Sequence, residues 1–225
     1  MMKRITFYLD FISPYAYLAF ERLPQVLQGL SYEVRYQPVL LAGMLSHFGQ
    51  KGPAEIEPKR AWTFRHVAWL AHQHGVPMQV PAEHPFNPLP LLRLALAASA
   101  PGHTPNRWVC EQIFHHVWRG EGAPQNANDP QRLADLTARL TDSLSQRGRG
   151  LADPQSEPIK QALKQATQDA IDLGVFGVPH LQADGRLYFG LEGLDLLSAA
   201  LRGEPWFDSG MWDEAAMVRP GVKRG

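Results

Sequence analysis

Apolar residues at two kinds of spacing organise the first forty residues of the chain. A mostly apolar run from Ile5 to Leu9 predicts a buried strand over residues 3–9, and the alternation over residues 32–39 predicts a second one. Between them, apolar residues recur at helical spacing from Pro14 onward, which predicts a helix that ends at Gly29. A strand, a helix and a strand in this order form a βαβ unit, so we expect the two strands to be parallel.

The middle of the chain is predicted to be helical throughout. After a short helical turn at 44–48 and a loop rich in Gly and Pro, the apolar spacing predicts a helix from Lys59 to His74. Further helices are predicted over residues 89–99, 105–118, 129–146 and 156–173. We therefore expect one large all-helical insertion.

Strand signals return near the end of the chain. Residues 179–183 and 187–189 flank Asp184-Gly185, a dipeptide typical of tight hairpin turns, and a helix is predicted over 194–201. This order predicts an α/β protein with a thioredoxin-like fold that carries a large all-helical insertion. The expected parts are a discontinuous thioredoxin-like domain (1–42 and 174–205), an inserted helical domain (43–173) and a C-terminal extension (206–225) whose last residues, from 218, are expected to be mobile.

Charge and hydropathy remove several classes of function. Twenty-two basic and twenty-two acidic residues give no net charge, so neither nucleic acid nor an anionic membrane is expected as a partner. No stretch approaches the roughly 20 apolar residues that a membrane span requires, and the N-terminal apolar run, which ends at Asp10, is too short for a secretory leader. We expect a soluble, cytoplasmic protein.

Cysteine and histidine usage narrows the chemistry further. The single cysteine, Cys110, excludes an internal disulfide, a Cys-x-x-Cys redox pair and a cysteine-rich metal site, and we interpret it as a buried small hydrophobe. Among the histidines, His72 and His74 lie two positions apart and His115 and His116 are adjacent, so neither pair faces one point. No metal is expected.

The segment between the first strand and the first helix carries the clearest candidate chemistry. Ser13 is placed as the N-cap and Pro14 as the first helical residue, where its missing N–H costs nothing. In a thioredoxin-like fold, a cysteine at this place is ionised by the helix dipole and the unpaired amides. Here a hydroxyl stands instead, so the site is suited to a thiolate that the chain does not supply. Taken alone, Ser-Pro is most often only a cap, and Val178-Pro179 only a turn.

Together, residues 7–15 (Phe-Tyr-Leu-Asp-Phe-Ile-Ser-Pro-Tyr) and 176–179 (Phe-Gly-Val-Pro) resemble the 2-hydroxychromene-2-carboxylate isomerases, which are similar to kappa-class glutathione transferases within the DsbA-like group. The resemblance covers roughly residues 3–205. It implies glutathione as the cofactor, with Ser13 as the catalytic residue that hydrogen-bonds its sulfur. It also implies a cis Val178–Pro179 bond that leaves the backbone of Val178 free to pair with the tripeptide.

The resemblance also assigns binding residues. For glutathione they are Ser13, Pro14, Val178, Pro179, Gly190, Leu191 and Glu192. For an aromatic carboxylate substrate we expect Gln50, Lys51, Trp62 and Phe86. The chain departs from the family where Glu192 and Gly193 replace an Asp and an Arg, and where His66 and Trp69 replace another such pair on the 59–74 helix.

In this family the thiolate adds to a conjugated substrate, the former double bond rotates, and elimination returns glutathione unchanged. The implied function is a glutathione-dependent cis–trans isomerase acting on a 2-hydroxychromene-2-carboxylate-like acid in aromatic catabolism, and a homodimer is expected. Two alternatives stay open. One is a kappa-like glutathione transferase, which releases a conjugate. The other is a redox-inactive thioredoxin-like module that binds peptides along the Val178–Pro179 edge.

Overall fold

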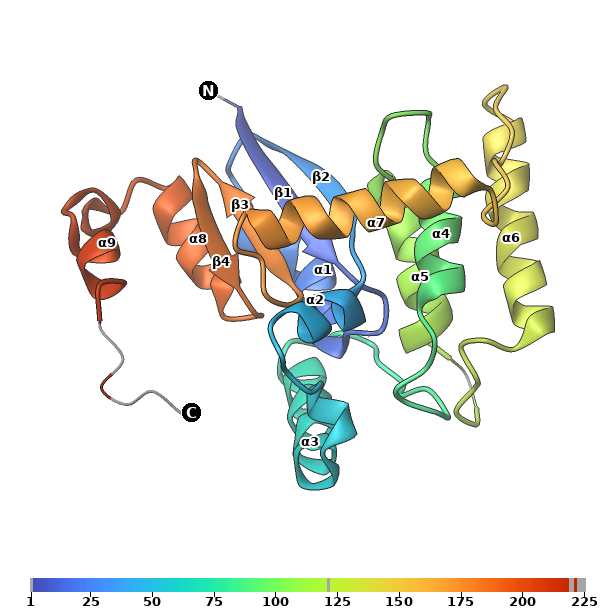
Figure 1. Ribbon diagram of the computed structural model, residues 1–225, viewed down its shortest axis with the longest axis horizontal. Helices are drawn as coiled ribbons and strands as arrows, with labels where there is room; N and C mark the ends of the chain where they lie inside the picture. Colours follow the sequence, from blue (N-terminus) through green and yellow to red (C-terminus); the bar gives the residue numbers. More distant parts are fainter. Residues whose placement is uncertain (1, 121, 219–220, 222–225) are drawn as a thin grey trace.

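A four-stranded sheet forms the centre of the computed structural model, which describes residues 2–120, 122–218 and 221 (Figure 1). The strands lie in the order β2–β1–β3–β4. Their bounds are β1 Lys3–Leu9, β2 Tyr32–Pro38, β3 His180–Ala183 and β4 Arg186–Phe189. β1 and β2 are parallel, whereas β1–β3 and β3–β4 are antiparallel. The prediction of a βαβ unit followed by an antiparallel hairpin is confirmed.

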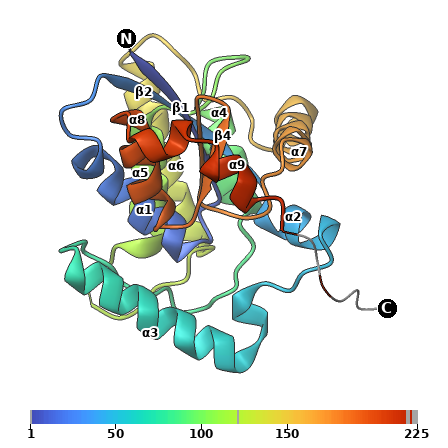
Figure 2. The ribbon, with the colours of Figure 1, turned by 90° about the vertical axis from the view of Figure 1, so that its left-hand side faces the viewer.

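Helices cover both faces of the sheet and fill the middle of the chain. Their bounds are α1 Pro14–Val26, α2 Leu41–His47, α3 Glu57–Gln73, α4 Leu89–Ala97, α5 Arg107–Trp118, α6 Pro130–Ser145, α7 Glu157–Asp172, α8 Gly193–Leu201 and α9 Met211–Ala215. α7 crosses one face of the sheet, α1 and α8 lie on the other, and α3 projects away from the body of the molecule (Figure 1, Figure 2). The thioredoxin-like α/β fold with helices between β2 and β3 is as predicted.

Alternate residues of β1 enter two separate apolar clusters, because successive side chains of a strand point to opposite faces. Ile5, Phe7 and Leu9 are buried in the main core with side chains of α1, α4, α5 and α8. Tyr8 points to the other face and joins a smaller cluster with Val178 and residues of α7. Since the main core contains side chains of both the sheet and the inserted helices, the domain boundaries stay a prediction.

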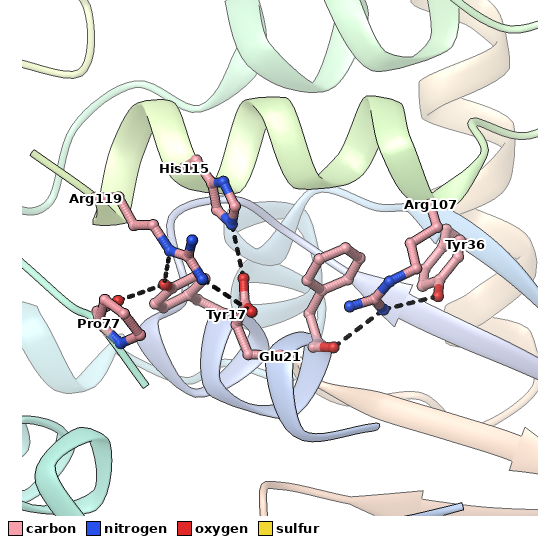
Figure 3. Close-up of polar contacts among 8 residues, drawn as sticks. Tyr17, Glu21, Tyr36, Pro77, Arg107, His115 and Arg119 are labelled. Carbon is pink, nitrogen blue, oxygen red and sulfur yellow. Dashed lines mark hydrogen bonds and ion pairs between the residues drawn. The ribbon is translucent and has the colours of Figure 1, made fainter. Parts of the chain in front are cut away.

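Polar side chains tie α1 to α5 beside the main core (Figure 3). The Glu21 carboxylate lies 2.8 Å from Nε2 of His115 and 3.1 Å from the guanidinium of Arg119. Arg119 also donates to the hydroxyl of Tyr17, which donates to the carbonyl of Pro77. Burial by itself raises the pKa of Glu21, but the hydrogen bond with His115 and the charge of Arg119 bring it below its usual value. These contacts fix α1, whose first turn carries the predicted site.

Two helices begin earlier than predicted, each for a local reason. α2 starts at Leu41 because the carboxylate of Asp10 accepts a hydrogen bond from the N–H of Leu41 at 2.9 Å and so caps this helix. α3 starts at Glu57 because Pro58 fits into a first helical turn, where no N–H is needed.

The C-terminal extension contains structure that the apolar pattern did not predict. It forms a 3₁₀ turn, Pro205–Asp208, and then α9. The ring of Trp212 lies 5.7 Å from that of Tyr188 and 5.5 Å from that of Phe207, so aromatic packing holds the extension against β4. The predicted mobility from residue 218 concerns residues that, apart from 218 and 221, lie outside the described part of the chain.

Candidate active site

Ser13 lies between the end of β1 and the start of α1. Its backbone is extended (φ −86°, ψ 116°), and its Oγ accepts a hydrogen bond from the N–H of Ala16 at 3.2 Å, as an N-cap does. Pro14 occupies the first helical position, as predicted. The backbone N–H of Tyr15 belongs to the first turn, where a helix leaves amides unpaired. The positive end of the dipole of α1 therefore lies at the hydroxyl of Ser13.

The two segments that define the predicted site meet at this hydroxyl. Ser13 Oγ donates to the carbonyl oxygen of Val178 at 3.3 Å, across 165 positions of the chain. The Val178–Pro179 peptide bond is cis, as the resemblance implied. β3 begins at His180, one residue later than predicted, because Pro179 has no N–H to pair. The helix start and the cis-proline segment thus form one wall around Ser13, which is only 5% exposed.

The start of α8 is joined to the same wall. The N–H of Gly190 donates to the carbonyl of Pro179 at 3.0 Å, and its φ of +81° favours glycine. A Cβ at Gly193 would lie 3.0 Å from the carbonyl carbon of Tyr188, so α8 approaches β4 too closely for a side chain there. Leu191 is buried, and its N–H lies just before the helix, where an anion is favoured. The predicted glutathione-binding residues are therefore contiguous.

The carboxylate of Glu192 folds back over this helix start. A Cβ built on Gly190 would lie 2.4 Å from Oε2 of Glu192, so the two residues are in contact. A carboxylate ligand at the amides before α8 is repelled by this side chain, which has to turn into solvent to admit it. Glu192 is exposed, so the rotation meets little resistance from packing.

Asp10 is the buried acid of the site, and the sequence analysis gave it no role. It is 0% exposed and accepts hydrogen bonds from the N–H groups of Ile12 at 3.2 Å and Leu41 at 2.9 Å. Burial raises its pKa to about 7, against the lowering effect of these backbone hydrogen bonds. Asp10 therefore ties the turn before Ser13 to the start of α2. Its signal in the sequence is an acid directly after a buried strand.

An unpredicted pair of side chains also lies next to Ser13. The hydroxyl of Tyr15 is 2.9 Å from Nδ1 of His66 on α3. The ring of Trp62, one helical turn earlier, stacks on His66 at 6.0 Å and 12°. Burial raises the pKa of Tyr15, and the nearby carboxylate of Glu192 raises it further. The pair connects the first turn of α1 with a predicted substrate residue.

The other predicted substrate residues are not joined to Ser13 by contacts in the described part of the chain. Gln50 and Lys51 are exposed in the loop after α2. Trp62 is 66% exposed on α3, whereas Phe86 is buried in the main core beside His84. Nε2 of His84 lies 2.9 Å from the carbonyl of Ile12, so this loop is fastened to the turn before Ser13. The substrate roles of these four residues stay predictions.

Cys110, the single cysteine, is remote from this chemistry. It is fully buried in the main core, and burial raises the pKa of its thiol. A buried, protonated thiol is a poor nucleophile. Any thiolate at Ser13 therefore has to come from a ligand.

Other binding features lie elsewhere or are lacking among the residues that the structure describes. A hollow of about 1080 Å³ on the α7 face, lined by Tyr8, Arg35 and Asp169 among others, includes none of the predicted site residues. In residues 2–120, 122–218 and 221, no group of three or more His, Cys, Asp or Glu side chains is placed to hold a metal ion. No helix within that part is long and apolar enough to span a membrane.

A thioredoxin-like sheet, inserted helices and a cis-proline segment facing a helix N-terminus define a DsbA-like protein with a serine at the N-terminus of its first helix. A family described as the DSBA-like thioredoxin domain matches residues 4–202, and the chain belongs to this family.

Relatives of known activity cover almost the whole chain. It is 27% identical over 203 residues to a 2-hydroxychromene-2-carboxylate isomerase of Sphingobium xenophagum, which spans 89% of this chain and 99% of that protein. It is 26% identical over 208 residues to glutathione S-transferase kappa 1 of Rattus norvegicus, with 88% and 90% covered. A solved structure of a 2-hydroxychromene-2-carboxylate isomerase has a TM-score of 0.73 at 22% identity, over 92% of this chain and 98% of that one, which shows the fold. The family resemblance is confirmed, and these relatives are enzymes.

Proposed function

We propose that this protein is a glutathione-dependent cis–trans isomerase that acts on a 2-hydroxychromene-2-carboxylate-like conjugated acid. The observation that carries the proposal is the hydroxyl of Ser13, which caps α1 and donates to Val178 in the cis-proline segment. When glutathione binds, this hydroxyl turns from the Val178 carbonyl to the sulfur. A charge-assisted hydrogen bond and the dipole of α1 then favour the thiolate over the thiol.

The thiolate serves as a borrowed nucleophile in this scheme. Its sulfur bonds to a carbon of the conjugated double bond, and the π electron pair moves onto the substrate carbonyl oxygen. Rotation about the former carbon–carbon double bond follows, the electron pair returns, the carbon–sulfur bond breaks, and glutathione leaves unchanged. The chain's own thiol, Cys110, is buried and takes no part.

The binding site for glutathione has two ends in this proposal. The backbone of Val178 pairs with the extended tripeptide as an added strand does. The amides of Leu191 and Glu192 before α8 take the γ-glutamyl carboxylate once the Glu192 side chain has rotated away. Lys51, in the loop after α2, supplies a positive charge for the substrate carboxylate, and Gln50, Trp62 and Phe86 complete the substrate side.

The test is glutathione titration by calorimetry, with thiolate ultraviolet absorbance, on the native protein and on Ser13→Ala. We expect binding in the native protein, and a thiolate signal at pH 7 that falls in the variant toward the roughly 3% ionisation of a free thiol, because one donor to the anion is lost. No binding at millimolar glutathione would overturn the proposal and leave a peptide-binding module as the better explanation.

A glutathione transferase is the second candidate, favoured by the similarity to the rat kappa protein. Product analysis separates the two reactions. An isomerase leaves the glutathione concentration unchanged over many turnovers, whereas a transferase consumes one glutathione for each product molecule.

A further inference from the structure

The hydrogen bond between Tyr15 and His66 leads beyond the proposed function and rests on it. Tyr15 lies two residues after Ser13, and its hydroxyl is 2.9 Å from Nδ1 of His66. Both side chains are partly exposed, and α3 buries only Val67 and Ala71. A hydrogen bond that is open to solvent contributes little to the free energy of folding, so stability does not explain this contact.

The pair sits where the two halves of the predicted site meet. On the glutathione side, the carboxylate of Glu192 is close enough to raise the pKa of Tyr15. On the substrate side, His66 stacks on Trp62 at 6.0 Å. The phenol hydroxyl therefore lies between the residues expected to hold the tripeptide and a residue expected to hold an aromatic ring.

The hydrogen-bonding capacity of the two groups suits a donor aimed at a ligand. A phenol has one proton to donate and lone pairs to accept with. In the tautomer that carries its proton on Nδ1, His66 donates to Tyr15, and the O–H of Tyr15 is free to point at the substrate. Burial and Glu192 both act against ionisation of the phenol, so it stays a donor at neutral pH.

Thiolate addition creates a need for such a donor. When the sulfur bonds to an α,β-unsaturated ketone, the electron pair of the double bond ends on the carbonyl oxygen as an enolate. A donor placed at a developing oxyanion is among the largest single contributions to catalysis. Ser13 and the first-turn amides of α1 face the sulfur, so they do not serve this oxygen.

We propose that Tyr15 donates a hydrogen bond to the enolate oxygen formed by thiolate addition, and that His66 is the residue that positions the phenol. No net proton transfer is required. The carbon–sulfur bond forms as the electron pair moves to oxygen, Tyr15 holds that charge during rotation, and the pair returns as the thiolate leaves.

The test compares two acceptors that place the negative charge on different groups when the thiolate adds. With glutathione, 4-phenylbut-3-en-2-one gives an enolate, whereas 1-chloro-2,4-dinitrobenzene places the charge on nitro groups and loses chloride. We expect Tyr15→Phe to lower kcat for the enone ~100-fold. The variant leaves kcat for the chloroarene within about twofold and the thiolate absorbance unchanged, because neither needs this donor. Tyr32→Phe, the same change at the opposite end of the sheet, is the matched control and keeps both rates.

The positioning role of His66 is tested by comparing two substitutions, one that removes the N–H donor and one that replaces it. His66→Ala is expected to lower the enone rate roughly tenfold, since the phenol loses its orientation. His66→Asn restores most of that loss, because its amide N–H takes the place of Nδ1–H. Equal losses in Ala and Asn variants would overturn the positioning role.

Failure of the inference is distinguishable from failure of the proposed function. Loss of the thiolate signal in Tyr15→Phe, or an equal fall in both rates, would place Tyr15 on the sulfur and overturn the inference alone. A native protein that forms the thiolate but does not accelerate enone addition would also overturn it. A native protein that binds no glutathione removes the proposed function itself and the inference with it.

Discussion

The two halves of the candidate site are built in opposite ways. The thiolate half, where glutathione is proposed to bind, consists of the turn before α1, the cis-proline segment and the start of α8. Its members Asp10, Ser13 and Val178 are all buried. The substrate half consists of the loop after α2 and the exposed face of α3. There Trp62 and Trp69 face solvent, and α3 is attached by two buried side chains, Val67 and Ala71, and by the partly buried Phe64 and Leu70.

Under the proposed function, this difference separates the residues that bind the nucleophile from the residues that select the acceptor. Backbone groups and a capped helix hold the thiolate half, so its geometry follows from the fold. Exposed side chains form the substrate half, and substitutions at such positions cost little stability. One scaffold can thus change substrates while keeping its thiolate site, and three experiments test how far this division holds.

The largest effect is expected from converting the serine into a thiol. In Ser13→Cys the introduced thiol lies at the N-terminus of α1, and its pKa should fall from ~8.5 into the range of about 3.5–7.5. The rate of iodoacetamide alkylation against pH, followed by mass spectrometry, measures this value. Cys110 serves as an internal control, because it is buried and should stay unmodified.

The matched control places a thiol at the opposite end of a helix. Ser46 is exposed in the last turn of α2, so the thiol introduced by Ser46→Cys should keep a pKa near ~8.5 or above. Equal pKa values in the two variants would mean that the helix start at Ser13 does not stabilise a thiolate.

A smaller effect is expected at Asp10, which fastens the thiolate half to α2. Its pKa in the folded protein is about 7, above the ordinary 3.8, so the folded state binds this proton more tightly than the unfolded chain. The free energy of unfolding therefore falls as pH rises through this interval, by on the order of 4 kcal/mol at most. The side chain of Asp10→Asn does not titrate. The free energy of unfolding of the variant minus that of the native protein should therefore increase from pH 5 to pH 8.

Urea unfolding at several pH values measures the effect at Asp10. The exposed Asp195→Asn is the control and should follow the native protein throughout. Parallel stability curves for the native protein and Asp10→Asn would show that folding does not raise the pKa of Asp10.

The smallest effect on stability is expected in the substrate half. Trp62→Ala should change the free energy of unfolding by less than about 0.5 kcal/mol, because the side chain is 66% exposed. It should raise KM for an aromatic acceptor roughly threefold to tenfold, the value of one aromatic contact. Trp69→Ala, on the same helix and 58% exposed, is expected to leave KM unchanged. Equal KM shifts in both variants would place the acceptor elsewhere on α3.

Local patterns predicted the helix start at Ser13 well. A cap and a proline at the start of a helix depend on a few adjacent residues, so Ser13 and Pro14 were placed by composition and spacing alone. The parallel pairing of β1 with β2 and the β3–β4 hairpin also followed from sequence order and strand signals. The contact between Ser13 and Val178 spans 165 positions, and only the family resemblance indicated it.

The substrate half was predicted less well, because its contacts depend on how helices pack. Periodicity does not show which residue of α3 meets α1, so the Tyr15–His66 pair was missed. Phe86 illustrates the same limit: the sequence did not show that this loop residue packs into the main core, and its substrate role stays a prediction. Asp10 was passed over since its burial becomes visible only when α2 is placed against it.

The absence of a sulfur atom at the end of β1 has a consequence for how such a protein meets oxidative stress. A thioredoxin-like protein with cysteine at this helix gains and loses electrons itself, so oxidants change the protein. With a hydroxyl at Ser13 and the single thiol of Cys110 enclosed in the core, neither residue offers an accessible thiol to oxidants. Under the proposed function, its rate follows the occupancy of reduced glutathione. Depletion of that pool silences the protein without damaging it, and replenishment restores it by mass action alone.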